Sequence, residues 1–386
     1  MSKNTSKPIA FGSLLNSSAI LSKQLYQQII VYFLLIFLLQ VLISSPVITA
    51  LMNLMLKSSG DHAIGNFDIA VFMLSPAGLG FLLLTGITTL LLSMVILSGL
   101  ILLAGSAMQG EPLPLTQMFA ALKKKLGPVA GLAALGTVMI LLLVLPAAGL
   151  LLLVNNSLLG QHDINYYLTQ RPTEFKLAVT LAIVIVLPVL IAVIGIITTL
   201  CIALPYILFE NQGPIAALKS SRKLLKGNYR LVLSLVARLL LALFIISVVI
   251  HGVIYIMGSL LIQATESSMA LLLISLGLNL TANVIVATVI IYLAQCALAF
   301  SILLIWRSAH GESTHPPEFI KPVYIQHRRL SYALLLGFLG GSIMLAYSLL
   351  NSVDIEDKVI IAAHRGSSLK APENLFSAVK QAEKDG

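Results

Sequence analysis

The sequence predicts an all-α polytopic membrane protein of about seven transmembrane helices with cytoplasmic amphipathic helices, followed by one short strand–helix unit. Of its 386 residues, 58% are hydrophobic and 10% are charged, a composition that excludes an ordinary soluble multidomain protein. Seven apolar stretches have the length of about 20 residues that a helix needs to cross roughly 30 Å of hydrocarbon. From residue 351 onward the composition changes, which indicates a separate domain there.

The seven stretches define a membrane domain at residues 29–350, between a cytoplasmic segment at 1–28 and the start of a further domain at 351–386. Several stretches are longer than a bilayer requires, so we expect tilt, kinks or extensions beyond the membrane. The predicted spans are residues 29–51, 79–107, 127–154, 177–208, 231–262, 270–304 and 332–350.

The positions of lysine and arginine predict the orientation in the plasma membrane. Basic residues gather before the first span and after the second, fourth and sixth spans, whereas the alternate loops hold only Lys57, Arg171 and Lys176. Because positively charged loops stay in the cytoplasm, the amino terminus is predicted to be cytoplasmic. After seven crossings, the segment from about residue 351 is then extracytoplasmic.

This distribution also explains the formal net charge of +9. The basic residues lie in short loops between apolar segments, where they set topology, so they predict no nucleic-acid partner. The lipid bilayer is the predicted partner, and the sequence carries no signal of oligomeric state.

A period of about 100 residues relates the basic segments. Residues 120–127 and 220–227 are similar, and each follows a proline-containing turn and precedes an apolar span; residues 8–28 are a fainter third copy. Each segment has apolar and basic sides, a pattern typical of a helix in the headgroup plane. We expect three units of one surface helix and two spans, with the seventh span appended. The alternative is that positive loops merely resemble one another.

Few polar groups lie inside the spans, which argues against an ion or proton pathway. Arg238 is close enough to a membrane surface for its side chain to reach water, and His251 is interpreted as a neutral histidine bonded to a neighbour. Asn279, Asn283 and Gln295 are predicted to form hydrogen bonds between helices.

The final segment begins with a predicted strand. Residues 359–363 form an apolar, β-branched run typical of a strand buried on both faces. His364, Arg365 and Gly366 follow it directly. In barrels of alternating strands and helices, catalytic groups project from this end of a strand.

A predicted helix follows the strand after a loop. Pro372, Glu373 and Asn374 open the helical pattern, and Gly386 suits its end. One face of this helix is apolar and consists of Leu375, Phe376, Val379 and Ala382.

These residues resemble the opening motif of the glycerophosphodiester phosphodiesterase family. That motif is an apolar strand, His-Arg-Gly, a spacer and Pro-Glu-Asn, and six positions of this chain match it with appropriate spacing. One departure is Leu375, which stands where the family usually has threonine. The apolar portion is similar in layout to the multi-span membrane domain that precedes the catalytic domain in some bacterial members.

The resemblance implies a TIM-barrel hydrolase that splits glycerophosphodiesters into glycerol phosphate and an alcohol with a divalent metal, Mg²⁺ or Ca²⁺. Arg365 would bind the phosphate through its planar guanidinium, and His364 would transfer a proton near neutral pH. Glu373 and Asn374 would bind substrate or fix the loop around the site. Substrate binding is therefore expected at Arg365, Glu373 and Asn374.

The family's acidic metal-binding pair and second histidine lie downstream of the segment that matches residues 383–386. We therefore expect this chain to carry a truncated catalytic domain, with part of the active site and no phosphodiesterase activity of its own. A different function remains open: the membrane portion could transport substrate, present lipid or bind a partner, because anchoring an enzyme requires only one span.

Overall fold

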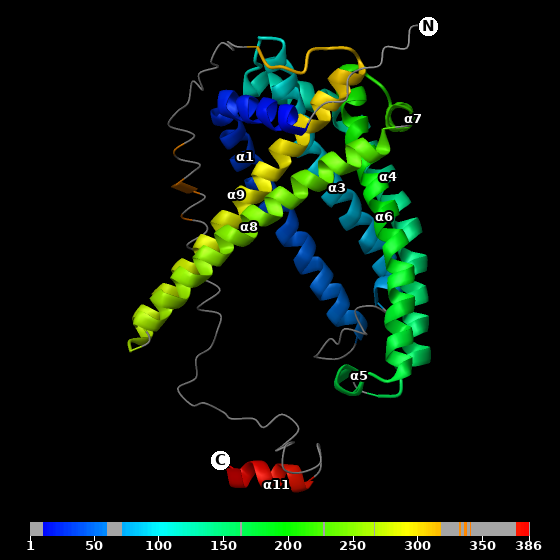
Figure 1. The fold of residues 1–386 in the computed structure, drawn as a ribbon, viewed down its shortest axis with the longest axis vertical. Helices are drawn as coiled ribbons and strands as arrows, with labels where there is room; N and C mark the ends of the chain where they lie inside the picture. Colours follow the sequence, from blue (N-terminus) through cyan, green and yellow to red (C-terminus); the bar gives the residue numbers. More distant parts are fainter. Residues whose placement is uncertain are drawn as a thin grey trace.

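A computed structural model describes residues 11–59, 72–162, 164–226, 228–265, 267–317 and 376–385, together with single positions between 332 and 340. All secondary structure in these residues is helical (Figure 1). The helices are α1 (Phe11–Ser59), α3 (Pro76–Met108), α4 (Leu115–Leu158), α5 (Ile164–Gln170), α6 (Thr173–Phe209), α7 (Pro214–Leu225), α8 (Tyr229–Thr265), α9 (Met269–Ala309) and α11 (Phe376–Asp385).

Six of these helices are long and apolar enough to cross a membrane, which confirms the predicted all-α multi-pass architecture. They correspond to the first six predicted spans, while the predicted seventh span at 332–350 lies outside the continuously described residues. The first helix differs from the prediction in its start. It begins at Phe11 and continues past residue 28, so the predicted boundary of the membrane domain falls inside a helix.

The helices extend well beyond one bilayer. α4 has 44 residues and α9 has 41, and at about 1.5 Å per residue such helices are roughly twice as long as the hydrocarbon is thick. Their burial is uneven along their length. Buried residues concentrate at 94–108 in α3, 198–208 in α6 and 296–307 in α9. These three helix ends contact one another and form the centre of the core, against which buried residues of α1 and α4 also pack.

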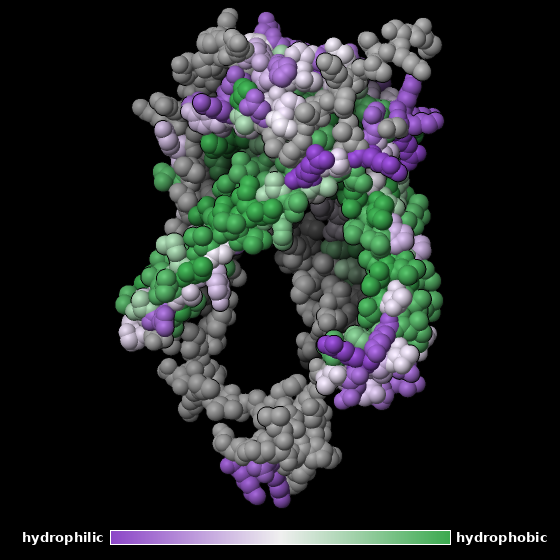
Figure 2. Space-filling model, viewed as in Figure 1, coloured by the Kyte–Doolittle hydropathy of each residue, from purple (hydrophilic) through white to green (hydrophobic). Residues whose placement is uncertain are grey.

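The opposite ends of the helices diverge. In Figure 1 the core lies at the top, and the α4–α6 and α8–α9 pairs separate below it. Large apolar side chains are exposed along both pairs, such as Leu142, Ile191 and Tyr255. Figure 2 shows this apolar surface below a hydrophilic upper end. The diverging pairs therefore suit a lipid environment, and the converging ends suit the water beyond it.

Glycines allow the core helices to approach closely. A Cβ atom added at Gly99 of α3 would overlap the hydroxyl of Tyr32 in α1, which donates a hydrogen bond to the Val95 carbonyl at 2.7 Å. A Cβ at Gly136 of α4 would lie 2.5 Å from Leu200 of α6. Such small residues permit close backbone packing where helices cross.

The predicted three-unit repeat is visible at the ends of the core helices. α3, α6 and α9 end at intervals of about 100 residues, and each is followed by a cap residue and then by a residue with positive φ. These residues are Gly110 (φ 80°), Asn211 (φ 56°) and Gly311 (φ 73°).

Each of the three ends also closes with a backbone hydrogen bond that runs back into the helix. The amides of Glu111, Gln212 and Glu312 donate to the carbonyls of Ser106, Tyr206 and Arg307 at 3.2, 3.2 and 2.9 Å. This left-handed C-terminal closure is a common helix ending. Its recurrence at the same place in each unit supports a true repeat over a chance similarity of basic loops.

Of the three predicted surface helices, only one is a separate helix in the described residues. α7 is a distinct helix, which ends where Lys226 adopts an extended conformation. Residues 120–127 instead form part of α4, which continues through Pro128, and residues 11–28 form part of α1. The apolar face of α4 runs on from Met118 and Leu122 to Val129, so packing on the core outweighs the hydrogen bond lost at the proline.

The final helix of the chain agrees with its prediction. α11 spans Phe376–Asp385, within the helical pattern expected after residues 372–374. The predicted strand at 359–363 lies outside the described residues, so the barrel unit stays a prediction.

Candidate functional site

The four predicted site residues, His364, Arg365, Glu373 and Asn374, lie outside the described residues. Their mutual geometry therefore stays a prediction. Within the described part of the chain, no group of three or more histidine, cysteine, aspartate or glutamate side chains could hold a metal ion. The predicted divalent metal, whose ligands are expected downstream of the segment that matches residues 383–386, stays a prediction.

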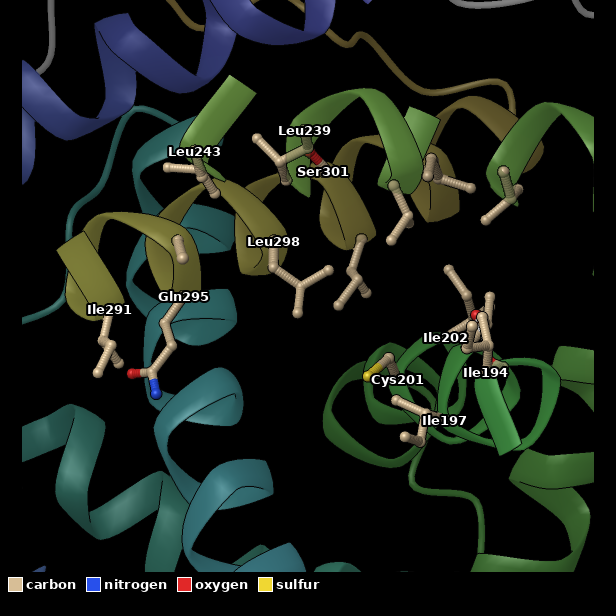
Figure 3. A pocket seen from close by; sticks show the side chains of 16 residues that line it. Ile194, Ile197, Cys201, Ile202, Leu239, Leu243, Ile291, Gln295, Leu298 and Ser301 are labelled. Atoms are coloured by element: carbon tan, nitrogen blue, oxygen red, sulfur yellow. Dashed lines mark hydrogen bonds between the residues drawn. The ribbon is translucent and has the colours of Figure 1, made fainter. Parts of the chain in front are cut away.

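The described residues form an apolar cleft where the two helix pairs begin to separate. The cleft lies between α6, α8 and α9 and has a volume of about 400 Å³ (Figure 3). This volume falls in the range of about 300–1,000 Å³ that is usual for small-molecule sites. Ile197 and Cys201 form the α6 wall, Leu239 the α8 wall, and Ile291 and Leu298 the α9 wall.

The chemistry of the cleft is that of hydrocarbon. Among its lining residues none is charged, and the few polar ones include Thr198, Gln295 and Ser301. The Thr198 hydroxyl donates to the Ile194 carbonyl of its own helix at 2.8 Å. The Gln295 side-chain oxygen is buried without a hydrogen-bond partner. The cleft can therefore hold an apolar chain, and it offers no nucleophile paired with a base.

The hydrogen-bond partners of the polar residues inside the helices agree with the predictions for His251 but not for Asn283. His251 bonds the Ser247 carbonyl at 2.9 Å, in agreement with the expected neighbouring partner. The prediction for Asn283 is wrong, because its amide donates to Asn279 within the same helix, at 2.7 Å to the side-chain oxygen. Within one helix a residue four positions away lies closer than the neighbouring helix.

A side-chain hydrogen bond between α8 and α9 is formed by two hydroxyl groups and not by the predicted asparagines. The Thr265 hydroxyl donates to Ser275 at 3.0 Å, close to the turn that joins the two helices. Asn279 reaches α8 by packing, since a Cβ atom at Gly258 would overlap its amide.

A polar cluster missed by the sequence reasoning joins the core ends of α6 and α9. His310 lies 3.3 Å from Glu210, and its ring centroid lies 4.4 Å from that of Trp306, with the two rings tilted by 36°. The neighbouring Arg307 is buried and pairs with Glu312 at 3.0 Å. The positions of these residues, directly at the two helix ends, indicate a role in holding the core closed. Their wide spacing in sequence gave no signal of the contact.

The comparisons with known proteins agree with this architecture. A family model described as the membrane domain of glycerophosphoryl diester phosphodiesterase matches residues 16–343, which include all six membrane-capable helices. No curated protein and no solved structure matches the chain. Because the match covers most of the sequence, the chain belongs to the family of glycerophosphoryl diester phosphodiesterase membrane domains.

Proposed function

We propose that this chain is the membrane part of a glycerophosphodiester phosphodiesterase, whose catalytic segment begins near residue 359 and uses His364 and Arg365. The proposal is supported by two independent matches that follow one another along the chain, one to the membrane domain and one to the start of the catalytic domain. The family match to the membrane domain ends at residue 343, and the His-Arg-Gly and Pro-Glu-Asn residues follow at 364–366 and 372–374.

The proposed chemistry follows from the charge of the substrate. A phosphodiester is anionic and repels an attacking oxygen, so the Arg365 guanidinium would bind two phosphate oxygens and offset that charge. His364 would transfer a proton to or from the attacking or leaving oxygen. Glu373 and Asn374 would hold the substrate or the loop in place. A divalent metal bound by the complete catalytic domain would add positive charge at the phosphate.

Replacement of the histidine tests this proposal. In the purified full-length natural protein supplied with Mg²⁺ or Ca²⁺, His364→Ala is expected to lower glycerophosphocholine hydrolysis by about 100-fold to 10,000-fold, the usual contribution of a positioned proton-transfer group. The matched control is His162→Ala, at an exposed histidine outside the motif. Equal activity of the His364 variant and the natural protein would refute the assignment.

A second candidate function, presentation of lipid-borne substrate to the catalytic segment, is favoured by the apolar cleft. The cleft lies among helices that are long and apolar enough to cross a membrane, and its apolar lining suits a lipid chain better than a polar molecule. An acyl chain of a substrate could enter it from the side while the polar part of the molecule remains at the membrane surface.

Filling the cleft separates presentation from simple anchoring. In the full-length natural protein, Ile197→Trp places a bulky ring in the cleft, whereas Ile191→Trp changes a residue that is 60% exposed and does not line it. We expect Ile197→Trp to slow hydrolysis of a vesicle-embedded substrate with one acyl chain several-fold, and to leave hydrolysis of soluble glycerophosphocholine unchanged. An equal rate for both variants on both substrates would support a plain membrane anchor.

A further inference from the structure

We propose that the membrane domain binds an anionic phospholipid at the basic end of the helices, in a pocket at the junction of α4, α6, α7 and α8. The pocket has a volume of about 200 Å³. Six of the residues that line it are Met139, Gly195, Thr199, Leu200, Arg222 and Tyr229. This site is distinct from the proposed phosphodiester site and does not depend on it.

The pocket lies at the depth of a lipid headgroup. α6 begins at Thr173, with the charged residues Glu174 and Lys176 in its first turn and just beyond. About 20 helical residues cross the hydrocarbon, so the far surface of the bilayer falls near Gly195. α7 is attached at this level, because the Ser221 hydroxyl donates to the Thr199 carbonyl at 2.6 Å. Arg222 follows in sequence and therefore meets the same membrane surface.

The pocket offers a cation and a hydroxyl to a phosphate. The Arg222 side chain is exposed, and neither of the two ion pairs in the described part of the chain involves it. The Thr199 hydroxyl donates to the Gly195 carbonyl at 2.7 Å and accepts from the Tyr229 hydroxyl at 2.8 Å. A guanidinium binds two phosphate oxygens at once, and the Tyr229 hydroxyl can exchange its bond to Thr199 for one to a third oxygen.

The remaining walls favour a lipid over a free anion. Met139 and Leu200 give the pocket an apolar side next to Arg222, which suits the glycerol and first acyl carbons of a phospholipid. The surrounding segment at 214–230 holds five basic residues and no acidic one, and each basic residue near a membrane attracts anionic lipid by about 1 kcal/mol. Figure 2 shows hydrophilic residues gathered at this end of the molecule, above the apolar surface.

Lipid titration of the full chain tests the site. The purified protein in detergent is titrated with phosphatidylglycerol or phosphatidylcholine, and bound lipid is counted by native mass spectrometry. Arg222→Gln is expected to weaken phosphatidylglycerol binding about tenfold, the usual effect of losing a hydrogen bond to a charged group. Lys223→Gln is the matched control, because it removes the same charge from the next exposed position of α7 and does not line the pocket.

The outcomes separate a built site from general attraction. The proposal requires the Arg222 variant to lose affinity for phosphatidylglycerol while Lys223→Gln keeps it, with Tyr229→Phe giving a smaller loss. Equal losses in the Arg222 and Lys223 variants would show diffuse attraction and overturn the proposal. Displacement of the lipid by soluble glycerol phosphate would also overturn it, in favour of a free-anion site. Arg222→Lys, which keeps the charge but not the two-point contact, must also weaken binding.

Discussion

Single glycines decide how closely the core helices can pack. At Gly99, Gly105 and Gly136, a side chain of a neighbouring helix occupies the space that a Cβ atom would need. The clearest case is Gly99, where the buried Tyr32 hydroxyl reaches the backbone of α3 and bonds the Val95 carbonyl. Tyr32 is fully buried, so its ring has no free space into which to move. This contact fixes α1 against α3.

Gly99→Ala is therefore expected to lower the stability of the purified protein by about 1–3 kcal/mol, because overpacking forces neighbours away from their preferred positions. The measurement is thermal unfolding in detergent. Gly127→Ala is the control, since a Cβ atom there meets nothing within 4 Å and alanine favours a helix. If both variants unfolded at the same temperature as the natural chain, the close contact at Tyr32 would not contribute to stability.

The elements follow a common plan in which each unit ends at the core. α3, α6 and α9 carry most of the buried residues, and each closes with a positive-φ residue after its cap. The helices that pair with them, α1, α4 and α8, have exposed apolar surface away from the core. The core therefore depends on one helix from each unit, and each of these helices ends in the same kind of closure.

Six spans could be predicted because about 20 successive apolar residues are a strong local signal. The helix ends at Gly110 and Gly311 also have the glycine that the prediction rules expect. The continuation of α4 through Pro128 could not be predicted, because a proline normally ends a helix and only the shared core preserves this one. The unbroken start of α1 before residue 28 was missed for a similar reason, since its buried Leu21 and Leu25 contact other helices.

At the scale of the whole molecule, burial is concentrated at one end, and the two helix pairs separate toward the other (Figure 1). The apolar cleft and the Arg222 pocket both result from this arrangement. Neither could be predicted from the sequence, because the angle between helix pairs is set by contacts among residues about 100 positions apart. The proposed phosphodiesterase residues differ from the cleft and the pocket in this respect. A short sequence motif predicts them, but they lie outside the described residues.

We propose that the membrane domain of this chain holds a phosphodiester-cleaving segment on the outer side of the bilayer. The most direct measurement uses sealed, right-side-out membrane vesicles that contain the full-length natural protein or its His364→Ala variant. With glycerophosphocholine added outside, we expect release of glycerol phosphate by the natural protein and at least about 100-fold less by the variant. Release that appeared only after the vesicles were opened, or that the variant catalysed equally well, would contradict the account.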